Sequence, residues 1–212
     1  MIKAVLFDFD GVIANTESQY DCFFEQLGEK LHFNIPDFAA RLKGTRLPEA
    51  LDKQFPQLSE SLKKDIVRLT YEFELQMNYP LVPGVIDFIQ YLRKSDYKIA
   101  LVTSSDEEKM QVAMEKLNLT DVFDSEVMSG RIDRGKPDPS CYLLAASDLQ
   151  VSPSECLVFE DSRAGVQAGI AARMHVVGVA TTLPADVLKE YQPDDVISDF
   201  QDMNRLLSCL SL

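Results

Sequence analysis

The hydrophobic and polar positions divide this chain into one buried strand, a helical stretch and a long alternating region. Residues 2–7 (IKAVLF) are apolar at five of six positions, a pattern typical of a short strand that is buried on both faces of a parallel sheet. Between about residues 16 and 78, apolar residues instead recur every three or four positions, and strand-like runs are absent. This stretch therefore predicts four helices, of which two are short and lie near residues 35–42 and 48–55.

Beyond residue 80 the pattern changes to alternating strands and helices. Pro80, Pro83 and Gly84 mark the change, and Pro83 suits the first turn of a helix that runs to about residue 95. Apolar runs then predict strands at 98–103, 125–128, 156–160, 175–179 and 196–197. Helical spacing predicts helices at 106–117, 138–149 and 162–172.

Strands that alternate with helices in this way specify an α/β fold, a doubly wound parallel sheet with helices on both faces. We expect residues 1–13 and 80–212 to form this Rossmann-like core. Residues 14–79 would then form a four-helix cap domain, inserted after the first strand. In open parallel sheets ligands bind beyond the carboxyl ends of the strands, so the chemistry of this chain should lie there.

Composition agrees with a globular protein and narrows the choice of partners. The 212 residues are 46% hydrophobic and 26% charged, with a formal net charge of −13. That charge repels nucleic acid and anionic membrane surfaces, so we expect neither as a partner. We also expect the protein to be a monomer. An anionic substrate would need local help from a metal or a lysine. With two histidines in the chain, histidine triads and His-rich zinc sites are not expected.

The cysteines and the first residues indicate a compartment. Cys22, Cys141, Cys156 and Cys209 lie far apart, form no C-x-x-C pair and fall in segments that are predicted to be buried. Such cysteines are typical of free thiols in a reducing compartment. The first strand begins directly after Met1, and no apolar run approaches the ~20 residues of a membrane span. We therefore expect a cytoplasmic protein.

Two carboxylates follow the first strand. Asp8 and Asp10 stand two positions apart, so in an extended backbone both point to the same side, and Gly11 lets the chain turn away. Like charges so close raise each other's pKa unless a cation intervenes, so the pair indicates a shared proton or a bound metal. Taken alone, the pair could be an ordinary Asp-Gly turn at the end of a strand.

Three further segments change that interpretation, because they bring a hydroxyl, a lysine and a second pair of acids to the ends of strands. Thr103-Ser104-Ser105 follows the second strand at the start of a helix, where free backbone N–H groups and the helix dipole favour a phosphate. Lys136 opens the next long helix, and Glu160-Asp161 ends a later apolar strand. Carboxylates with no His or Cys nearby select a hard cation, so we expect Mg²⁺ as the cofactor.

Taken in order, these segments resemble the four motifs of the haloacid dehalogenase-like (HAD) superfamily of phosphotransferases. The matching segments are Asp8-Phe9-Asp10-Gly11-Val12, Thr103-Ser104-Ser105, Gly135-Lys136-Pro137 and Glu160-Asp161. The helical insertion after the first motif resembles the β-phosphoglucomutase-like branch of that superfamily. The run Phe159-Glu160-Asp161-Ser162, followed by Gly165, is similar to that branch as well.

The resemblance implies a role for each matching residue. Asp8 would attack phosphorus and become an aspartyl phosphate, and Asp10 would protonate the leaving oxygen and then activate the acceptor. Thr103 and the backbone N–H of Ser104 would hold phosphoryl oxygens, and Lys136 would offset the accumulated negative charge. The implied magnesium ligands are the side chain of Asp8, the backbone carbonyl of Asp10 and the carboxylate of Asp161, with Glu160 beside them.

The predicted cap carries two cations, Lys43 and Arg46, around a flexible glycine. They could form a solvated basic loop, or they could close over the site and contact the end of the substrate that is not transferred. The mutases of the resembled branch carry a histidine in the first cap helix and an arginine after a lysine-glycine pair. Tyr20 stands at the first of these positions here and Leu47 at the second, and both differences weaken a mutase interpretation.

Three functions are therefore compatible with the sequence. The preferred one is a magnesium-dependent phosphatase of small phosphate esters, in particular of sugar phosphates, that works through an aspartyl phosphate. The alternative is a β-phosphoglucomutase or related phosphohexomutase, which is an isomerase. The third is a non-hydrolytic, partner-binding role, against which the complete set of motif residues argues.

Overall fold

The computed structural model describes residues 1–33 and 35–212, and a parallel sheet forms its centre. Within these residues the sheet has six strands in the order β3-β2-β1-β4-β5-β6, and every neighbouring pair is parallel. The strands are Ala4–Phe7 (β1), Lys98–Val102 (β2), Ser125–Val127 (β3), Cys156–Glu160 (β4), His175–Val179 (β5) and Asp195–Ile197 (β6). The predicted doubly wound parallel sheet is therefore confirmed.

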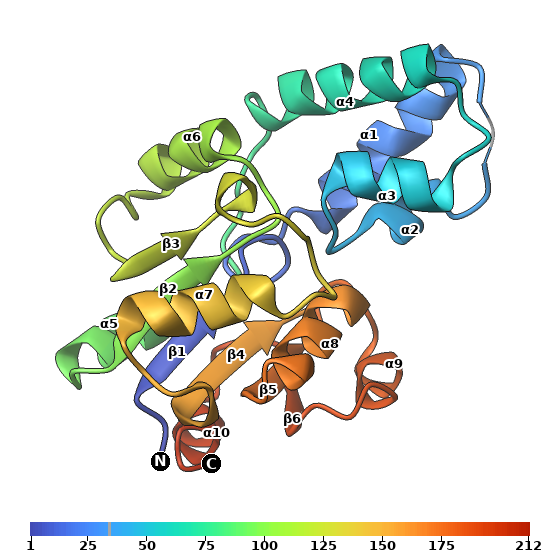
Figure 1. The fold of residues 1–212 in the computed structure, drawn as a ribbon. Helices are drawn as coiled ribbons and strands as arrows, with labels where there is room; N and C mark the ends of the chain where they lie inside the picture. The colour runs from blue at the N-terminus through green and yellow to red at the C-terminus, as the bar shows by residue number, and fades with distance from the viewer. Residues whose placement is uncertain (34) are drawn as a thin grey trace.

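Strand β1 lies in the middle of the sheet, because both of its edges are paired. Phe7 at its end is in register with Leu101 of β2 on one side and with Phe159 of β4 on the other. All four residues of β1 are buried, as its apolar run predicts. The segments that follow β1, β2 and β4 therefore all leave the sheet at the carboxyl ends of the strands (Figure 1).

Helices cover the two faces of the sheet through separate hydrophobic clusters. Because side chains alternate along a strand, Val5 and Phe7 belong to one cluster, and Ala4 and Leu6 belong to the other. The helices of the first cluster are α5 (Val85–Lys94), α6 (Glu107–Leu117) and α10 (Met203–Cys209). Those of the second cluster are α7 (Ser140–Leu149), α8 (Arg163–Ala171) and α9 (Ala185–Lys189).

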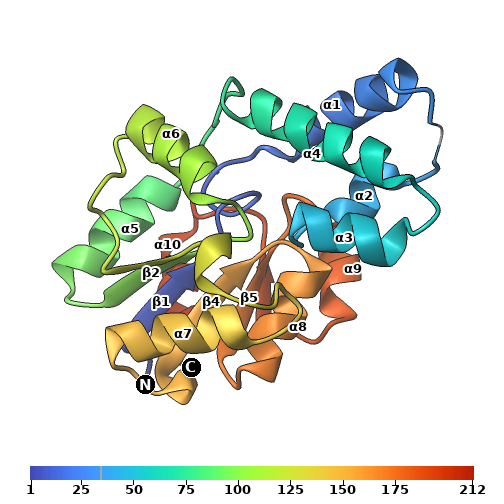
Figure 2. The same cartoon turned by 45° about the horizontal axis from the view of Figure 1, so that its top comes forward.

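Four helices of the described chain stand between β1 and α5, and we call them the cap. They are α1 (Glu17–Lys30), α2 (Phe38–Leu42), α3 (Leu47–Gln54) and α4 (Glu60–Glu74). The cap has a hydrophobic cluster of its own, in which Phe38 packs against Phe24 and Phe55. Figures 1 and 2 show the cap beside the carboxyl ends of the strands. That residues 14–79 form a separate domain stays a prediction, and Asn34 in that range lies outside the described residues.

The sequence pattern missed two short helices and placed the starts of two others too early. Helix α5 begins at Val85 after its N-cap Gly84, so Pro83 precedes the helix and does not lie in its first turn. Helices α9 and α10 have five and seven residues, which is too few turns to establish a helical period. The helix predicted from residue 138 begins at Ser140, because Pro139 disfavours helical backbone at the residue before it.

The cysteines are free thiols, as predicted. The expected burial of Cys22 is wrong, because α1 turns Phe24 and Leu27 toward the interior and leaves Cys22 exposed. Among the described helices, none combines the length and the apolarity that crossing a membrane would require.

Candidate active site

The segments that follow β1, β2 and β4 bring the predicted site residues together. Asp8 comes directly after β1, Thr103 comes after β2, and Glu160 ends β4 with Asp161 behind it. Gly11 turns the chain away with a φ of 78°, in the left-handed region that glycine tolerates. A Cβ on Gly11 would also overlap the carboxylate of Asp161, so only glycine lets this turn pass the acids.

Lys136 is a buried cation between two of these acids. Its Nζ donates to Asp8 Oδ1 at 2.7 Å, to Glu160 Oε1 at 2.7 Å and to the backbone carbonyl of Val102 at 3.2 Å. Burial alone would lower the pKa of Lys136, but the carboxylates of Asp8 and Glu160 raise it well above its usual value. Lys136 is therefore charged and ties the end of β1 to the end of β4.

Glu160 is held from several sides. Besides Lys136, its Oε1 accepts a hydrogen bond from Tyr142 Oη at 2.9 Å. Its Oε2 accepts from the backbone N–H of Ser162 at 3.1 Å and from Ser162 Oγ at 3.0 Å. Gly165 in α8 passes so close that a Cβ there would overlap the Glu160 carboxylate. Glu160 therefore anchors the buried lysine in a fixed direction.

Asp8, Glu160 and Asp161 form a buried group in which one oxygen of each lies within 4.8 Å of the others. Burial raises the pKa of Asp8 to about 7, although Lys136 acts in the opposite direction. Burial and the charges of Glu160 and Asp8 raise the pKa of Asp161 well above its usual value. Three buried carboxylates with one ammonium, which contacts two of them, fit a hard divalent cation that would restore the charge balance.

Asp10 faces a separate set of donors. Its Oδ1 accepts from Thr16 Oγ1 at 2.7 Å, and its Oδ2 accepts from Ser105 Oγ at 3.1 Å and from Lys109 Nζ. The two aspartate side chains therefore have different partners, and the prediction that both point to the same side is wrong. The reason is that β1 ends at Phe7, so the alternation of an extended strand does not continue to Asp10. The ligand role implied for the Asp10 backbone carbonyl does not depend on its side chain and stays a prediction.

Lys109 on α6 belongs to the site, but the sequence pattern did not reveal it. Its side chain is 1% exposed, and besides Asp10 its Nζ contacts Tyr20 Oη and Ser105 Oγ, both at 2.8 Å. Burial alone would lower the pKa of Lys109, but the charges of Asp10 and Glu74 raise it, so the lysine is charged. A helical lysine is normally expected at the surface, and its partners here lie far away in the sequence.

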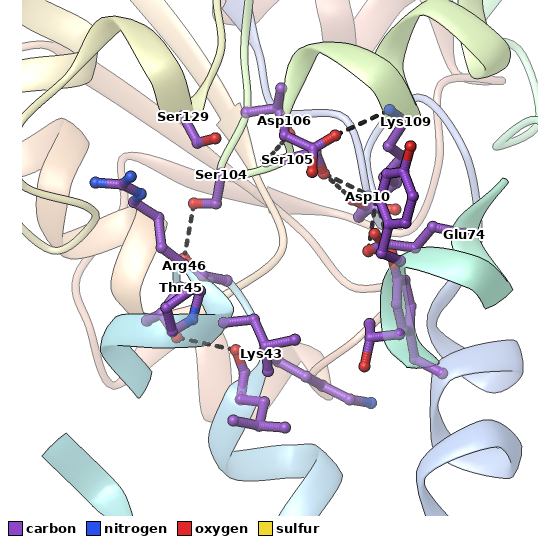
Figure 3. Close-up of a pocket in the computed structure, with 18 of the residues that line it drawn as sticks. Asp10, Lys43, Thr45, Arg46, Glu74, Ser104, Ser105, Asp106, Lys109 and Ser129 are labelled. Atoms are coloured by element: carbon purple, nitrogen blue, oxygen red, sulfur yellow. Dashed lines mark hydrogen bonds and ion pairs between the residues drawn. The ribbon is translucent and has the colours of Figure 1, made fainter. Parts of the chain in front are cut away.

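A cavity of about 240 Å³ lies over these groups, with walls from both the cap and the core. Figure 3 shows Asp10, Lys109 and Glu74 together on one side of it, and Ser104 and Arg46 on the other. The remaining wall is largely apolar or aromatic and comes from cap residues that include Tyr20, Phe24, Leu42, Leu47 and Val67.

Thr103 and Ser104 line this cavity just before α6. Thr103 is buried, and its Oγ1 accepts from the backbone N–H of Ser105 at 3.1 Å. Ser104 Oγ donates to the backbone carbonyl of Gly44 in the cap at 3.5 Å. Their contact with phosphoryl oxygens stays a prediction.

Lys43 and Arg46 also line the cavity, and each has an acidic partner. Lys43 Nζ lies 3.0 Å from Glu17 Oε2 and 2.9 Å from Asp21 Oδ1. Arg46 Nη1 lies 2.8 Å from Glu49 Oε1. A second anionic group on a substrate would therefore compete with these carboxylates for the two cap cations.

Comparisons with known proteins agree with this arrangement. A family model described as haloacid dehalogenase-like hydrolase matches residues 2–173. The phosphorylated carbohydrates phosphatase of Thermotoga maritima is 30% identical over 194 residues, which cover 86% of this chain and 87% of that protein. The β-phosphoglucomutase of Bacillus subtilis is 30% identical over 197 residues, which cover 86% and 85%. The crystal structure of β-phosphoglucomutase from Clostridium difficile has a TM-score of 0.83 and 25% identity, over 100% of this chain and 98% of that chain.

Proposed function

Because this chain belongs to the haloacid dehalogenase-like hydrolases, we propose that it is a magnesium-dependent phosphatase of small phosphate esters, in particular of sugar phosphates. One observation carries the proposal. Three buried acids, two of which contact Lys136, lie together beneath the cavity, and Asp10 lies nearby with hydrogen-bond donors of its own. The similarity to a phosphatase of phosphorylated carbohydrates supports the substrate class.

In the proposed reaction Asp8 is the nucleophile and Asp10 carries the proton. An oxygen of Asp8 bonds to phosphorus, the bond from phosphorus to the ester oxygen breaks, and Asp10 gives its proton to the leaving alcohol. Asp10 then takes a proton from water, whose oxygen attacks phosphorus. The bond to Asp8 breaks, and inorganic phosphate leaves. The separate hydrogen-bond partners of the two aspartates support this division of roles.

Cations and donors around Asp8 would neutralise the transferred group. Thr103 and the backbone N–H of Ser104 would bind phosphoryl oxygens, and Lys136 would offset their charge. Bound magnesium would supply further neutralisation of the phosphoryl oxygens. The carboxylates of Asp8 and Asp161 and the backbone carbonyl of Asp10 would hold it, with Glu160 beside them.

The cap would close over the bound ester. Lys43 and Arg46 would contact the end of the substrate that is not transferred, and the cap would move about the connections at 13–16 and 79–84. Closure would exclude bulk water from the reacting phosphoryl group. We also propose that the protein acts as a monomer in the cytoplasm, because one chain supplies all of these residues and its cysteines are free thiols.

A β-phosphoglucomutase remains the second candidate, since two of the similar proteins carry that name. A mutase must also bind a bisphosphate, whose second phosphate needs cations at the cap end of the cavity. The partners of Lys43 and Arg46 argue against this, because Glu17, Asp21 and Glu49 already neutralise both cations. A partner-binding role without hydrolysis would regain support if the protein failed to hydrolyse p-nitrophenyl phosphate with magnesium.

One assay separates the two enzymatic functions. The protein is incubated with β-glucose 1-phosphate, magnesium and a trace of glucose 1,6-bisphosphate, and glucose 6-phosphate and free phosphate are measured together. We expect free phosphate to accumulate, both here and with other sugar monophosphates. Stoichiometric conversion to glucose 6-phosphate with little free phosphate would replace the phosphatase proposal with the mutase. The variant Asp8→Asn should lose all turnover in either case, because both reactions need the nucleophile.

A further inference from the structure

A chain of contacts around Lys109 connects Asp10 to the cap. Lys109 stands on α6 of the core, and its ammonium contacts Asp10, Ser105 and Tyr20. Tyr20 belongs to α1 of the cap, and its Oη donates to Glu74 Oε1 at the end of α4 at 2.6 Å. Glu74 Oε1 also lies 4.0 Å from Lys109 Nζ. One buried cation therefore joins the loop of the proposed acid to two helices of the cap.

The geometry leaves Lys109 no hydrogen-bonding capacity for a substrate. An ammonium has three hydrogens, and the three oxygens that Lys109 contacts use all of them. The Tyr20 ring is itself held between Phe24 and Phe73, at centroid distances of 6.1 and 5.6 Å. The position of its hydroxyl is therefore set by the packing of the cap.

We propose that Lys109 is a positioning residue, which holds the carboxyl group of Asp10 where, once protonated, it can give its proton to the leaving oxygen. Lys109 is itself held by Tyr20 and Glu74 of the cap. The proposal rests on the phosphatase function, because it concerns the leaving-group proton of that reaction. Movement of the cap away from the core would remove Tyr20 and Glu74 from Lys109 and leave Asp10 less well aligned. Proton delivery is in this way tied to a cap that encloses the ester.

Two substrates of nearly the same shape separate this role from a purely structural one. Phenyl phosphate and p-nitrophenyl phosphate differ by one nitro group, which makes the leaving phenol a stronger acid. The nitrophenolate leaves without much help from a proton, whereas the phenolate needs it. If Asp10 is no longer held in position, kcat/KM should therefore fall more for phenyl phosphate than for p-nitrophenyl phosphate. A structural defect should lower kcat/KM for both substrates equally.

The test variant is Lys109→Met, which keeps the length of the side chain and removes its donors. We expect kcat/KM for phenyl phosphate to fall roughly 100-fold and that for p-nitrophenyl phosphate to fall less than tenfold, since a general acid contributes about 10²–10⁴. Tyr20→Phe removes one partner of Lys109 and keeps the ring packing, so the same selective loss should appear at about fivefold. If Lys109→Met does not fold, Tyr20→Phe decides the question.

Lys116→Met is the matched control. Lys116 stands on the same helix and reaches the segment after α4, where its Nζ donates to the backbone carbonyl of Met77 at 3.0 Å. It is not among the residues that line the cavity. We expect both substrates to be hydrolysed at the unmodified rate. Equal losses on the two substrates in Lys109→Met or Tyr20→Phe would overturn the role of Lys109 and leave the phosphatase proposal standing. If the unmodified protein hydrolysed neither substrate, the phosphatase proposal and this inference would both fall.

Discussion

Without bound metal, the unfolding free energy of this protein should fall as the pH rises from 5 to 8. In the folded protein without metal, burial beside Glu160 and Asp10 gives Asp8 a pKa of about 7, whereas its ordinary value is 3.8. Folding therefore takes up a proton between these two values, and each pH unit in that window weakens the folded state. Asp161 acts in the same direction, because its pKa is also raised.

The magnitude follows from Asp8 alone. One pH unit corresponds to about 1.4 kcal/mol for a group that is protonated in the folded state and ionised in the unfolded state. Between pH 5 and the folded pKa of about 7, metal-free protein should therefore lose about 3 kcal/mol of unfolding free energy. Hydrogen bonds from Arg131 and Ser125 lower the pKa of Asp148, so its contribution is lost only at lower pH. It does not disturb this window.

The measurement is urea unfolding followed by circular dichroism, because the chain contains no tryptophan for fluorescence. In EDTA, the midpoint should fall by roughly 1–2 M urea between pH 5 and pH 8. Magnesium at about 100 times its dissociation constant should return about 2.7 kcal/mol at pH 8. The control Asp8→Asn should show a weaker dependence on pH and on magnesium. An unchanged or rising midpoint in EDTA from pH 5 to pH 8 would refute the reasoning.

Three further predictions follow from single contacts. Asp161→Asn should raise the magnesium concentration for half-maximal activity at least about tenfold, because a hard cation loses one of few protein ligands. Activity of the unmodified protein in EDTA would contradict the magnesium requirement itself. Gly165→Ala should lower kcat about 100-fold or more with an unchanged circular dichroism spectrum, since its Cβ displaces Glu160 and so releases Lys136. Arg205→Met should lower the unfolding free energy by about 1 kcal/mol and leave kcat unchanged, because its half-exposed pair with Asp195 at 2.6 Å lies away from the cavity; a change in kcat would show an unexpected coupling.

The sequence predicted the strands best where apolar runs have polar ends. The predictions for 156–160 and 175–179 agree residue by residue with β4 and β5, because both strands are covered on their two faces by helices. Strand β6 and helices α9 and α10 are short, so their local pattern gives little or no signal.

The candidate site was predictable where its residues directly follow strands. Asp8 directly follows β1 and Glu160 is the last residue of β4, and parallel pairing alone brings them to the same end of the sheet. Lys109 was not predictable, because its burial depends on Asp10, 99 positions away, and on Glu74 of the cap. A helical lysine has no local feature that distinguishes such a contact from a solvated surface position.

The central place of β1 also affects how the chain can fold during synthesis. Ala4 pairs with Lys98 on one side and with Cys156 on the other, so the ribosome must make most of the chain before β1 has both neighbours. Until then Asp8, the proposed nucleophile, has no Glu160 beside it, so the candidate site is incomplete in the nascent chain. The cap can pack earlier, since its cluster joins residues that are close in the sequence. A chain that stalls before β4 would expose one unpaired, fully apolar edge of β1, which makes such fragments natural targets for chaperones and proteases.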